Sequence, residues 1–211
     1  LITLNNPNYQ YVASRLLLAQ LRKDVWGGKN PPKLVDFINR NVHEHDVYDE
    51  DILMLYSDEE INKLDEYIDH SRDNNFTYAG MRQLCDKYLI QDRSETKIYE
   101  TPQFAYMIIA MVCFGKYEGP TRISYVKKAY DYFSRFKINL PTPLMAGVRS
   151  KVRQYASCCL IDVDDTLPSI FSSSTAAGYA TGSRYGIGLN MGRIRPLNSP
   201  IRNGEVVHTG V

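Results

Sequence analysis

The sequence predicts an α/β protein with a helical N-terminal region, residues 1–136, and an α/β C-terminal region, residues 137–211. Up to about residue 136, apolar residues recur at the three- and four-residue spacing of amphipathic helices. After the proline-containing stretch "KINLPTPLMAGVRS", two apolar runs of strand length flank a longer run of small residues. A chain of 211 residues is long enough to bury a substantial core.

The first half of the helical region carries clear helix boundaries. In "NNPNYQYVASRLLLAQLRKDVWGG", Asn6 can cap a first helix and Gly27 and Gly28 suit its exit. A second helix begins in "PPKLVDFINRNV". In "SDEEINKLDEYIDH", Ser57 and Glu60 have the spacing of a capping box, which predicts the start of a third.

The second half of this region predicts three more helices and a hairpin. The run "FTYAGMRQLCDKYL" indicates a fourth helix, in which Cys85 is expected to be a plain core residue. The polar middle of "IQDRSETKIYE" favours a short hairpin. Helices are then expected in "TPQFAYMIIAMVCFG" and "GPTRISYVKKAYDYFSRF". The first of these is nearly all apolar, which predicts a buried helix, and it is too short to cross a membrane.

The last third begins at prolines that flank Thr142, where they predict extended or turning backbone. A strand is expected in "SCCLIDV", a small-residue helix in "TLPSIFSSSTAAGYATGS", and a second strand in "RYGIGLNMGRIR", which ends in a loop. This order of elements predicts an α/β arrangement for the last third of the chain.

Composition narrows the class of protein. Lysine and arginine total 25 against 24 acidic residues, so there is no charge bias toward nucleic acid or a membrane surface. Four cysteines, at positions 85, 113, 158 and 159, have neither a zinc spacing nor a dense disulfide pattern, which favours a reduced, cytoplasmic setting. Leu1 in place of an initiator methionine and the Gly-Val end predict a fragment, or one piece of a split polypeptide.

The adjacent cysteines Cys158 and Cys159 stand at the head of a predicted strand. Neighbouring side chains on a strand point to opposite faces, so one thiol is expected to face the core and the other a cavity or a partner. A single exposed thiol that exchanges with a cysteine from elsewhere is chemically easier than a strained disulfide between neighbours. No second cysteine lies at CxxC spacing, so any partner thiol must come from elsewhere.

Glycines and arginines in "YGIGLNMGRIRPLNSPIRNGE" indicate a ligand. Gly186, Gly188 and Gly192 form GxGxxxG within and after a strand, which excludes a dinucleotide fingerprint and indicates close approach of a ligand or another backbone. Three arginines follow on a loop: Arg193, Arg195 and Arg202. Guanidinium groups on such a loop suit a phosphate or triphosphate, and the alternative is a solvated basic loop.

Hydroxyl and carboxylate side chains add further candidates. Thr142 and Ser157 can bind phosphate together with backbone N–H groups, or serve only as turn and strand-end hydroxyls. The acidic cluster of Asp162, Asp164 and Asp165 either caps the following helix, for which Thr166 is also suited, or accepts a bond from a sugar hydroxyl.

The runs "FKINLPTPLMAGVRS", "RQYASCCLID" and "YGIGLNMGRIRPLNSPIRNGEVVHTGV" closely resemble the large subunit of class I ribonucleotide reductase. Upstream, "NPNYQYVASRLLLAQLRKDVWG", "FTYAGMRQLCDKYLIQDR" and "IYETPQFAYMIIA" match the family's N-terminal helical part, so the resemblance covers almost the whole chain. It implies a helical region followed by the first strands and helices of the family's ten-stranded α/β barrel, which this chain does not complete.

The resemblance also implies roles for individual residues. Cys158 matches the first redox cysteine, which gives a reducing equivalent to the ribose and ends in a disulfide, and Cys159 matches a core position. The implied substrate-binding residues are Thr142 and Ser157, which hold the diphosphate, and Gly186. The implied residues of the site for an allosteric deoxynucleoside triphosphate are Asp165, Thr166, Leu167, Arg195, Ile201 and Arg202. The helix at residues 169–181 matches a dimer interface.

The activity implied is radical reduction of ribonucleoside diphosphates, with allosteric control of specificity. No covalently bound cofactor or metal ligand is expected in the chain. Mg²⁺ would accompany the dNTP or ATP effector, and a di-metal or tyrosyl radical cofactor would lie on a separate small subunit. The implied partners are the rest of the large subunit, a second large subunit, the radical-generating small subunit, thioredoxin or glutaredoxin, and nucleotides. Neither nucleic acid nor a membrane is expected.

In the family, the remaining catalytic groups would lie beyond Val211 and an ATP-binding domain before Leu1, so the chain alone is expected to be inactive. The expected location is the cytoplasm, or the host cytoplasm for a viral protein. The alternative is a non-catalytic nucleotide-binding or assembly module that regulates an intact reductase. Cys158, for which a pure regulator has no use, favours the enzyme.

Overall fold

The computed structural model describes residues 6–28, 30–152, 155–183 and 185–210. The chain forms two compact units, Leu1–Tyr155 and Ala156–Val211. The change of sequence pattern at residue 137 therefore does not coincide with the division between the units. Residues 137–152 belong to the first unit because Met145 and Val148 are buried in its core and Arg149 pairs with Glu100.

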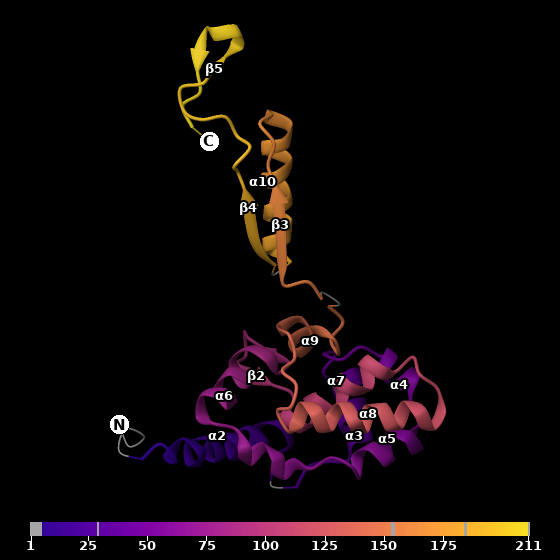
Figure 1. The fold of residues 1–211 in the computed structure, drawn as a ribbon. Helices are drawn as coiled ribbons and strands as arrows, with labels where there is room; N and C mark the ends of the chain where they lie inside the picture. Colours follow the sequence, from indigo (N-terminus) through magenta and orange to yellow (C-terminus); the bar gives the residue numbers. More distant parts are fainter. Residues whose placement is uncertain (1–5, 29, 153–154, 184, 211) are drawn as a thin grey trace. The chain divides into compact units, whose positions relative to one another are not determined.

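The first unit is helical with one small hairpin (Figure 1). Its elements are α2 (Tyr9–Trp26), α3 (Leu34–Asn39), η1 (Arg40–Glu44), α4 (Asp51–Leu55), α5 (Asp58–Asp65), η2 (His70–Asn75), α6 (Tyr78–Gln83), η3 (Leu84–Tyr88), β1 (Gln91–Asp92), β2 (Lys97–Ile98), α7 (Pro102–Phe114), α8 (Gly119–Ser134) and α9 (Thr142–Gly147). The six predicted helices and the antiparallel hairpin β1–β2 are confirmed. The pattern missed three short elements, α4, η2 and α9.

Local signals explain where several helices begin and end. Gly27 ends α2 in the left-handed conformation, at φ 81°, which glycine adopts without steric cost. Ser57 and Glu60 form the expected capping box at the start of α5. Pro141 is extended as expected, but the expectation was wrong for Thr142, which begins α9. A proline at position 143 is compatible with a helix because it falls in the first turn, where its missing N–H has no partner to lose.

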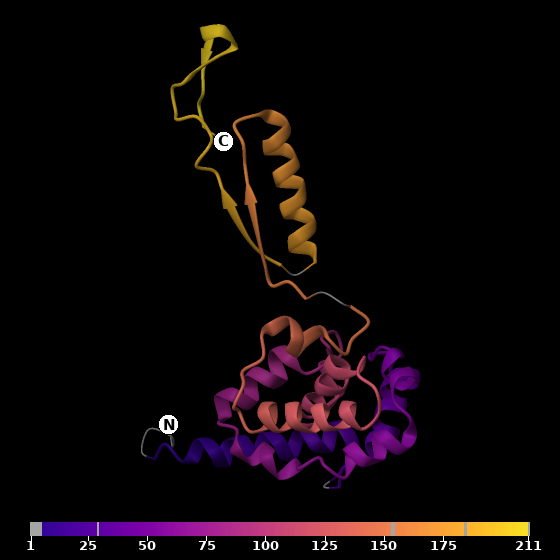
Figure 2. The same cartoon turned by 45° about the vertical axis from the view of Figure 1, so that its right-hand side comes forward.

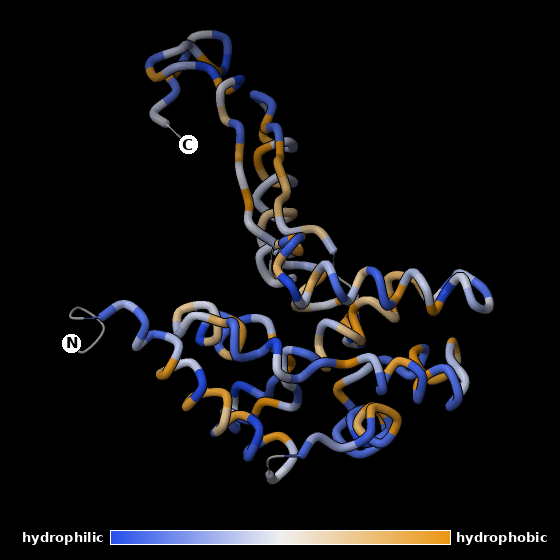
Figure 3. The backbone as a smooth tube through the Cα atoms, turned by 60° about the horizontal axis from the view of Figure 1, so that its bottom comes forward, coloured by the Kyte–Doolittle hydropathy of each residue, from blue (hydrophilic) through white to orange (hydrophobic). Residues whose placement is uncertain are grey.

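The core of the first unit is built around α7. Every residue from Pro102 to Met111 is buried, because the helix is apolar on all sides and has neighbours on all sides. The ring of Phe104 stacks on Phe37 with centroids 4.3 Å apart and meets the edge of Trp26. By contrast, hydrophilic and hydrophobic residues alternate along α2, the helix that follows the N-terminus (Figure 3). None of the described helices is long and apolar enough to span a membrane.

A buried polar network crosses this core. The carboxylate of Asp73 is fully buried and accepts bonds from Arg22 Nη2 at 2.9 Å and Gln103 Nε2 at 2.8 Å. Tyr130 donates to Gln103 Oε1 at 2.7 Å. Burial raises the pKa of Asp73 to about 6, because desolvation of the charged form outweighs the favourable bonds.

This raised pKa predicts a pH-dependent contribution to stability. Between pH 4 and pH 6 the folded state holds a proton on Asp73 that the unfolded chain has lost, so the contribution falls as pH rises. The unfolding free energy of the parent minus that of Asp73→Asn is expected to fall by about 2 kcal/mol from pH 4 to pH 7 and to be constant above. Urea unfolding followed by Trp26 fluorescence measures it. If the difference in unfolding free energy between the parent and Asp73→Asn did not change with pH, the raised pKa of Asp73 would be contradicted.

The second unit contains a parallel βαβ arrangement and a hairpin. Its elements are β3 (Cys158–Asp162), α10 (Leu167–Gly182), β4 (Gly186–Asn190), β5 (Pro200–Ile201), η4 (Arg202–Gly204) and β6 (Val206–Val207). β3 and β4 are parallel and in register from Cys158↔Gly186 to Asp162↔Asn190, as a helical crossover allows. In both views α10 runs alongside these strands (Figure 1 and Figure 2). The predicted strands and helix are confirmed.

The sheet of the second unit is open. Among the described residues, β3 and β4 pair only with each other. Leu160, at the centre of β3, is 87% exposed, and α10 carries Phe171 and Tyr179 with 66% and 79% of their surface exposed. Unpaired strand edges and exposed large apolar side chains are typical of surfaces that contact further polypeptide. Within the described part of the chain, the parallel sheet of the second unit is therefore open rather than closed, as expected.

Candidate functional site

The thiol of Cys158 lies at the start of two adjacent strands. Cys158 is exposed, and the hydroxyl of Ser157 donates to its Sγ at 3.9 Å. Gly186 stands opposite Cys158 in the parallel pair, and its N–H donates to Ser157 O at 2.8 Å. A Cβ on residue 186 would lie 3.2 Å from that carbonyl oxygen, so glycine permits the close approach. Three predicted site residues therefore meet at this end of the sheet.

Cys159 points the other way, as expected for the next residue of a strand. Exposed and partly buried residues alternate along β3, with Cys158, Leu160 and Asp162 exposed and Cys159 and Ile161 partly buried. Because α10 packs on β3 and β4, the partly buried side chains take the face that this helix covers. The prediction that the two thiols occupy different environments is confirmed, and Cys158 is the accessible one.

Carboxylates and arginines pair at the opposite end of the same strands. Arg195 Nε donates to Asp165 Oδ2 at 2.7 Å, and both side chains are partly exposed. Arg193 Nη1 donates to Asp164 Oδ1 at 3.0 Å. Sequence reasoning singled out these side chains separately and missed their pairing, for which the spacing carries no signal. The loop after β4 is thus held against the residues that follow β3.

The residues between β3 and α10 form a tight capping arrangement. Thr166 Oγ1 accepts from Ser169 N at 3.3 Å, and Ser169 Oγ accepts from Asp164 N at 2.9 Å. Thr166 is therefore the helix cap, whereas the side chains of Asp164 and Asp165 bind arginines. Leu167 begins α10 with most of its side chain exposed. The structure thus brings Asp165, Thr166 and Leu167 of the predicted effector site together with Arg195.

Ile201 and Arg202 lie in the β5–β6 hairpin. Ile201 pairs with Val206, and the turn places Arg202, Asn203 and Gly204 at φ 52°, 58° and 92°. Left-handed backbone costs about 1–2 kcal/mol at a residue such as Arg202, whereas asparagine adopts it more readily. Such local strain is concentrated at ligand-binding segments. The turn presents Arg202 as an exposed side chain.

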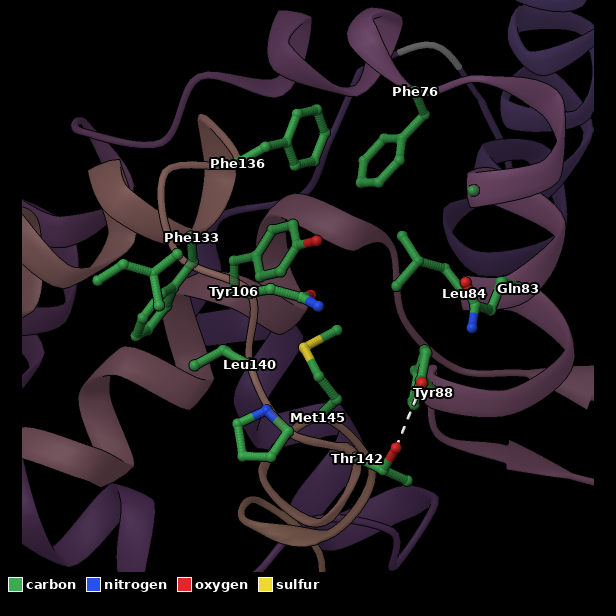
Figure 4. A pocket seen from close by; sticks show the side chains of 14 residues that line it. Phe76, Gln83, Leu84, Tyr88, Tyr106, Phe133, Phe136, Leu140, Thr142 and Met145 are labelled. Carbon is green, nitrogen blue, oxygen red and sulfur yellow. Dashed lines mark hydrogen bonds between the residues drawn. The ribbon is translucent and has the colours of Figure 1, made fainter.

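Thr142 belongs to the first unit, whereas the other predicted site residues belong to the second. Its Oγ1 lies 3.3 Å from the hydroxyl of Tyr88, and both line a cavity of about 560 Å³ (Figure 4). Most of the lining is apolar or aromatic, and the phenol of Tyr106 is directed into the space (Figure 4). Burial raises the pKa of Tyr106 above its usual range, because the charged phenolate would be desolvated.

A buried ion pair is hydrogen-bonded to the backbone of Tyr88 and Met145, which line this cavity. Arg149 and Glu100 are both fully buried and bonded to each other, with Arg149 Nε 2.8 Å from Glu100 Oε2. Tyr48 donates to the same carboxylate oxygen at 2.7 Å, and burial raises the pKa of Tyr48 well above its usual range. The sequence carries no signal for the burial of Arg149 and Glu100, because a lone arginine or glutamate is usually a surface residue. Among the described residues no cluster of three or more His, Cys, Asp or Glu side chains suits a metal ion.

Two family models match the chain. Residues 74–153 match the ribonucleotide reductase all-alpha domain, and residues 156–211 match the ribonucleotide reductase barrel domain. The division between these matches falls where the structure separates the two units.

Similarity between the whole of this chain and part of several curated proteins supports the same relationship. The chain is 48% identical to ribonucleoside-diphosphate reductase 1 subunit alpha of Escherichia coli over 210 residues. It is 47% identical to ribonucleoside-diphosphate reductase subunit alpha of Buchnera aphidicola subsp. Baizongia pistaciae and 44% identical to that of Enterobacteria phage T4. Each alignment covers 100% of this chain and 28% of the relative, so the chain spans little more than a quarter of these proteins.

Proposed function

Because the chain belongs to the family of ribonucleotide reductase large subunits, we propose that it is part of the α subunit of a ribonucleoside-diphosphate reductase. In this proposal the chain works with the remaining large-subunit polypeptide to reduce ribonucleoside diphosphates to deoxyribonucleoside diphosphates. The observation that carries the proposal is the exposed thiol of Cys158, grouped with Ser157 and Gly186 at the start of two parallel strands.

Cys158 has a defined chemical task in this proposal. Its thiol and a second thiol from the remaining polypeptide are oxidised to a disulfide, and the two electrons and two protons that they release reduce the ribose carbon. The 2′ hydroxyl leaves as water. Thioredoxin or glutaredoxin then reduces the disulfide by thiol–disulfide exchange. The radical cofactor of a separate small subunit supplies the oxidising equivalent that starts the reaction. Ser157 and Thr142 hold the substrate diphosphate through their hydroxyl groups.

The end of the sheet that carries Asp165 and Arg195 is proposed to bind the deoxynucleoside triphosphate that selects the substrate. Arg195 is already oriented by Asp165, and a phosphate oxygen is a comparable acceptor for its planar guanidinium. Ile201 and Arg202 complete the site from the hairpin. Mg²⁺ would enter with the triphosphate. The exposed apolar side chains of α10 suit packing against a second large subunit beside this site.

The effector site yields a direct test. Arg195→Gln in the assembled subunit is expected to raise the dissociation constant of the effector triphosphate at least about tenfold, because one charge-assisted hydrogen bond is lost. Isothermal titration calorimetry measures the constant. Arg193→Gln is the matched control, since Arg193 follows the same strand and also pairs with a carboxylate. Equal effects of the two variants would contradict the specific role of Arg195.

The overall function is tested by a reductase assay of the assembled complex. Purified protein carrying this chain, supplied with the small subunit, a dithiol reductant and an effector, is expected to convert a ribonucleoside diphosphate to its deoxy form. Dependence of this reaction on Cys158 separates the enzyme from the alternative, a nucleotide-binding module that regulates an intact reductase.

A further inference from the structure

The guanidinium of Arg149 joins two elements of the first unit. Its Nη1 donates to Met145 O at 2.7 Å, on α9, and its Nη2 donates to Tyr88 O at 3.1 Å, at the end of η3. The side chain is completely buried, so neither carbonyl bond competes with water. Because the donors of an arginine form a rigid planar fork, these two bonds fix the backbone of α9 relative to that of η3.

The same two elements carry the hydrogen-bonded hydroxyl pair at the cavity. Tyr88 OH lies 3.3 Å from Thr142 Oγ1, with Met145 also lining the cavity (Figure 4). Met145 follows Thr142 by one helical turn, so the bond to Met145 O restrains the helix that carries Thr142. Arg149 therefore restrains both partners of this hydroxyl pair through their backbones.

Glu100 in turn restrains the guanidinium. Its carboxylate accepts from Arg149 Nε, from Tyr48 OH at 2.7 Å and from Ile90 N at 2.7 Å, so the buried charges are fully partnered. A buried ion pair often contributes no more to stability than well-packed apolar residues of the same volume. Stability alone therefore gives little reason for an ion pair at this place. The ion pair is better explained by the fixed direction that it gives to both hydrogen bonds from Arg149 to the carbonyls.

We propose that Arg149, oriented by Glu100, is a positioning residue that sets the hydroxyl of Thr142 for the diphosphate of the substrate. This inference rests on the proposed function, in which Thr142 contacts that diphosphate. The diphosphate does not react, so we expect its contact with Thr142 to be about equally strong in the ground state and in the transition state, which is uniform binding. If the hydroxyl of Thr142 is no longer held in position, we therefore expect KM to rise while kcat stays nearly unchanged.

The test variant is Arg149→Lys in the assembled reductase. Lysine keeps the positive charge beside Glu100, but its compact ammonium group lacks the planar fork that holds both carbonyls. We expect KM for the ribonucleoside diphosphate to rise about tenfold, with kcat changed less than about twofold and effector affinity unchanged. Tyr88→Phe, which removes the hydroxyl beside Thr142 and leaves the buried core intact, is expected to raise KM as well. If Arg149→Lys does not fold, an unchanged KM in Tyr88→Phe overturns the inference, because the hydroxyl pair that Arg149 restrains would then have no effect on the substrate.

Tyr48→Phe is the matched control. It removes one bond to the same carboxylate but leaves both carbonyl bonds of Arg149 in place, so it is expected to lower the melting temperature without changing KM. In a Thr142→Val background, adding Arg149→Lys is expected to raise KM no further. Equal KM effects of Tyr48→Phe and Arg149→Lys would reduce the role of Arg149 to stability and overturn the inference.

The two proposals fail differently. If Thr142→Val raises KM while Arg149→Lys and Tyr88→Phe leave it unchanged, the positioning role is overturned and the proposed function stands. If Thr142→Val itself leaves KM unchanged in an active complex, both the substrate contact of Thr142 and the positioning role are overturned. If the assembled complex forms no deoxyribonucleotide, the proposed function fails and the inference fails with it.

Discussion

Cys158→Ser is expected to abolish ribonucleoside-diphosphate reduction by the assembled complex, to the level of the assay blank. A serine hydroxyl neither forms a disulfide nor releases two electrons with a partner thiol, so the ribose has no reductant. Cys158 is the exposed member of the cysteine pair, and its neighbours Ser157 and Gly186 are the other predicted substrate residues of the second unit. Deoxyribonucleotide formation with thioredoxin or dithiothreitol as the reductant measures the effect.

The adjacent cysteine supplies the control. Cys159→Val removes a thiol one residue away but replaces it with a side chain of similar volume on the face that α10 covers. This variant is expected to keep turnover within about threefold of the parent, because a volume-conserving change disturbs packing little. Unchanged turnover in Cys158→Ser, with effector binding intact, would exclude the reducing role and favour the regulatory module.

Arg149→Met is expected to destabilise the first unit by about 3–5 kcal/mol, since it leaves the carboxylate of Glu100 buried without its counter-ion. Urea unfolding measures the loss through Trp26, the single tryptophan of the chain, whose ring meets Phe104 in the core. The expected result is a lower unfolding midpoint with an unchanged slope.

A second substitution separates the charge effect from lost packing. Arg149→Met combined with Glu100→Gln is expected to be more stable than Arg149→Met alone. Glutamine carries no charge, and its amide oxygen still accepts a bond from Tyr48 or Ile90. A double variant that is no more stable than the single one would show that the unpaired charge is not the cause of the loss.

Much of the helical unit could be predicted because its signals are local. The capping box of Ser57 and Glu60 and the left-handed exit at Gly27 each involve residues within a few positions of one another. Short helices such as α4 and α9 escaped prediction, because isolated helices of five or six residues are unstable and depend on tertiary packing.

In the candidate site, too, local features could be predicted from the sequence and long-range contacts could not. Recognition of the sequence motifs singled out Cys158, Thr142 and Arg195, and the alternation of a strand predicted that the two adjacent thiols face opposite sides. The partners of these residues could not be predicted. Asp165 and Arg195 are 30 positions apart, and Tyr88 and Thr142 are 54 apart, so only the folded chain brings them together.

The sequence by itself determined the order of the longer helices and of β3 and β4, the opposite directions of the two adjacent thiols, and the resemblance to the ribonucleotide reductase family. The first two depend on hydrogen bonding and side-chain direction over a few residues. Only the tertiary structure decided that the units divide after Tyr155, that Asp165 holds Arg195 rather than capping α10, and that Arg149 is buried. Long-range packing sets burial, and burial determines whether a charged side chain is a solvated surface group or a fixed structural contact.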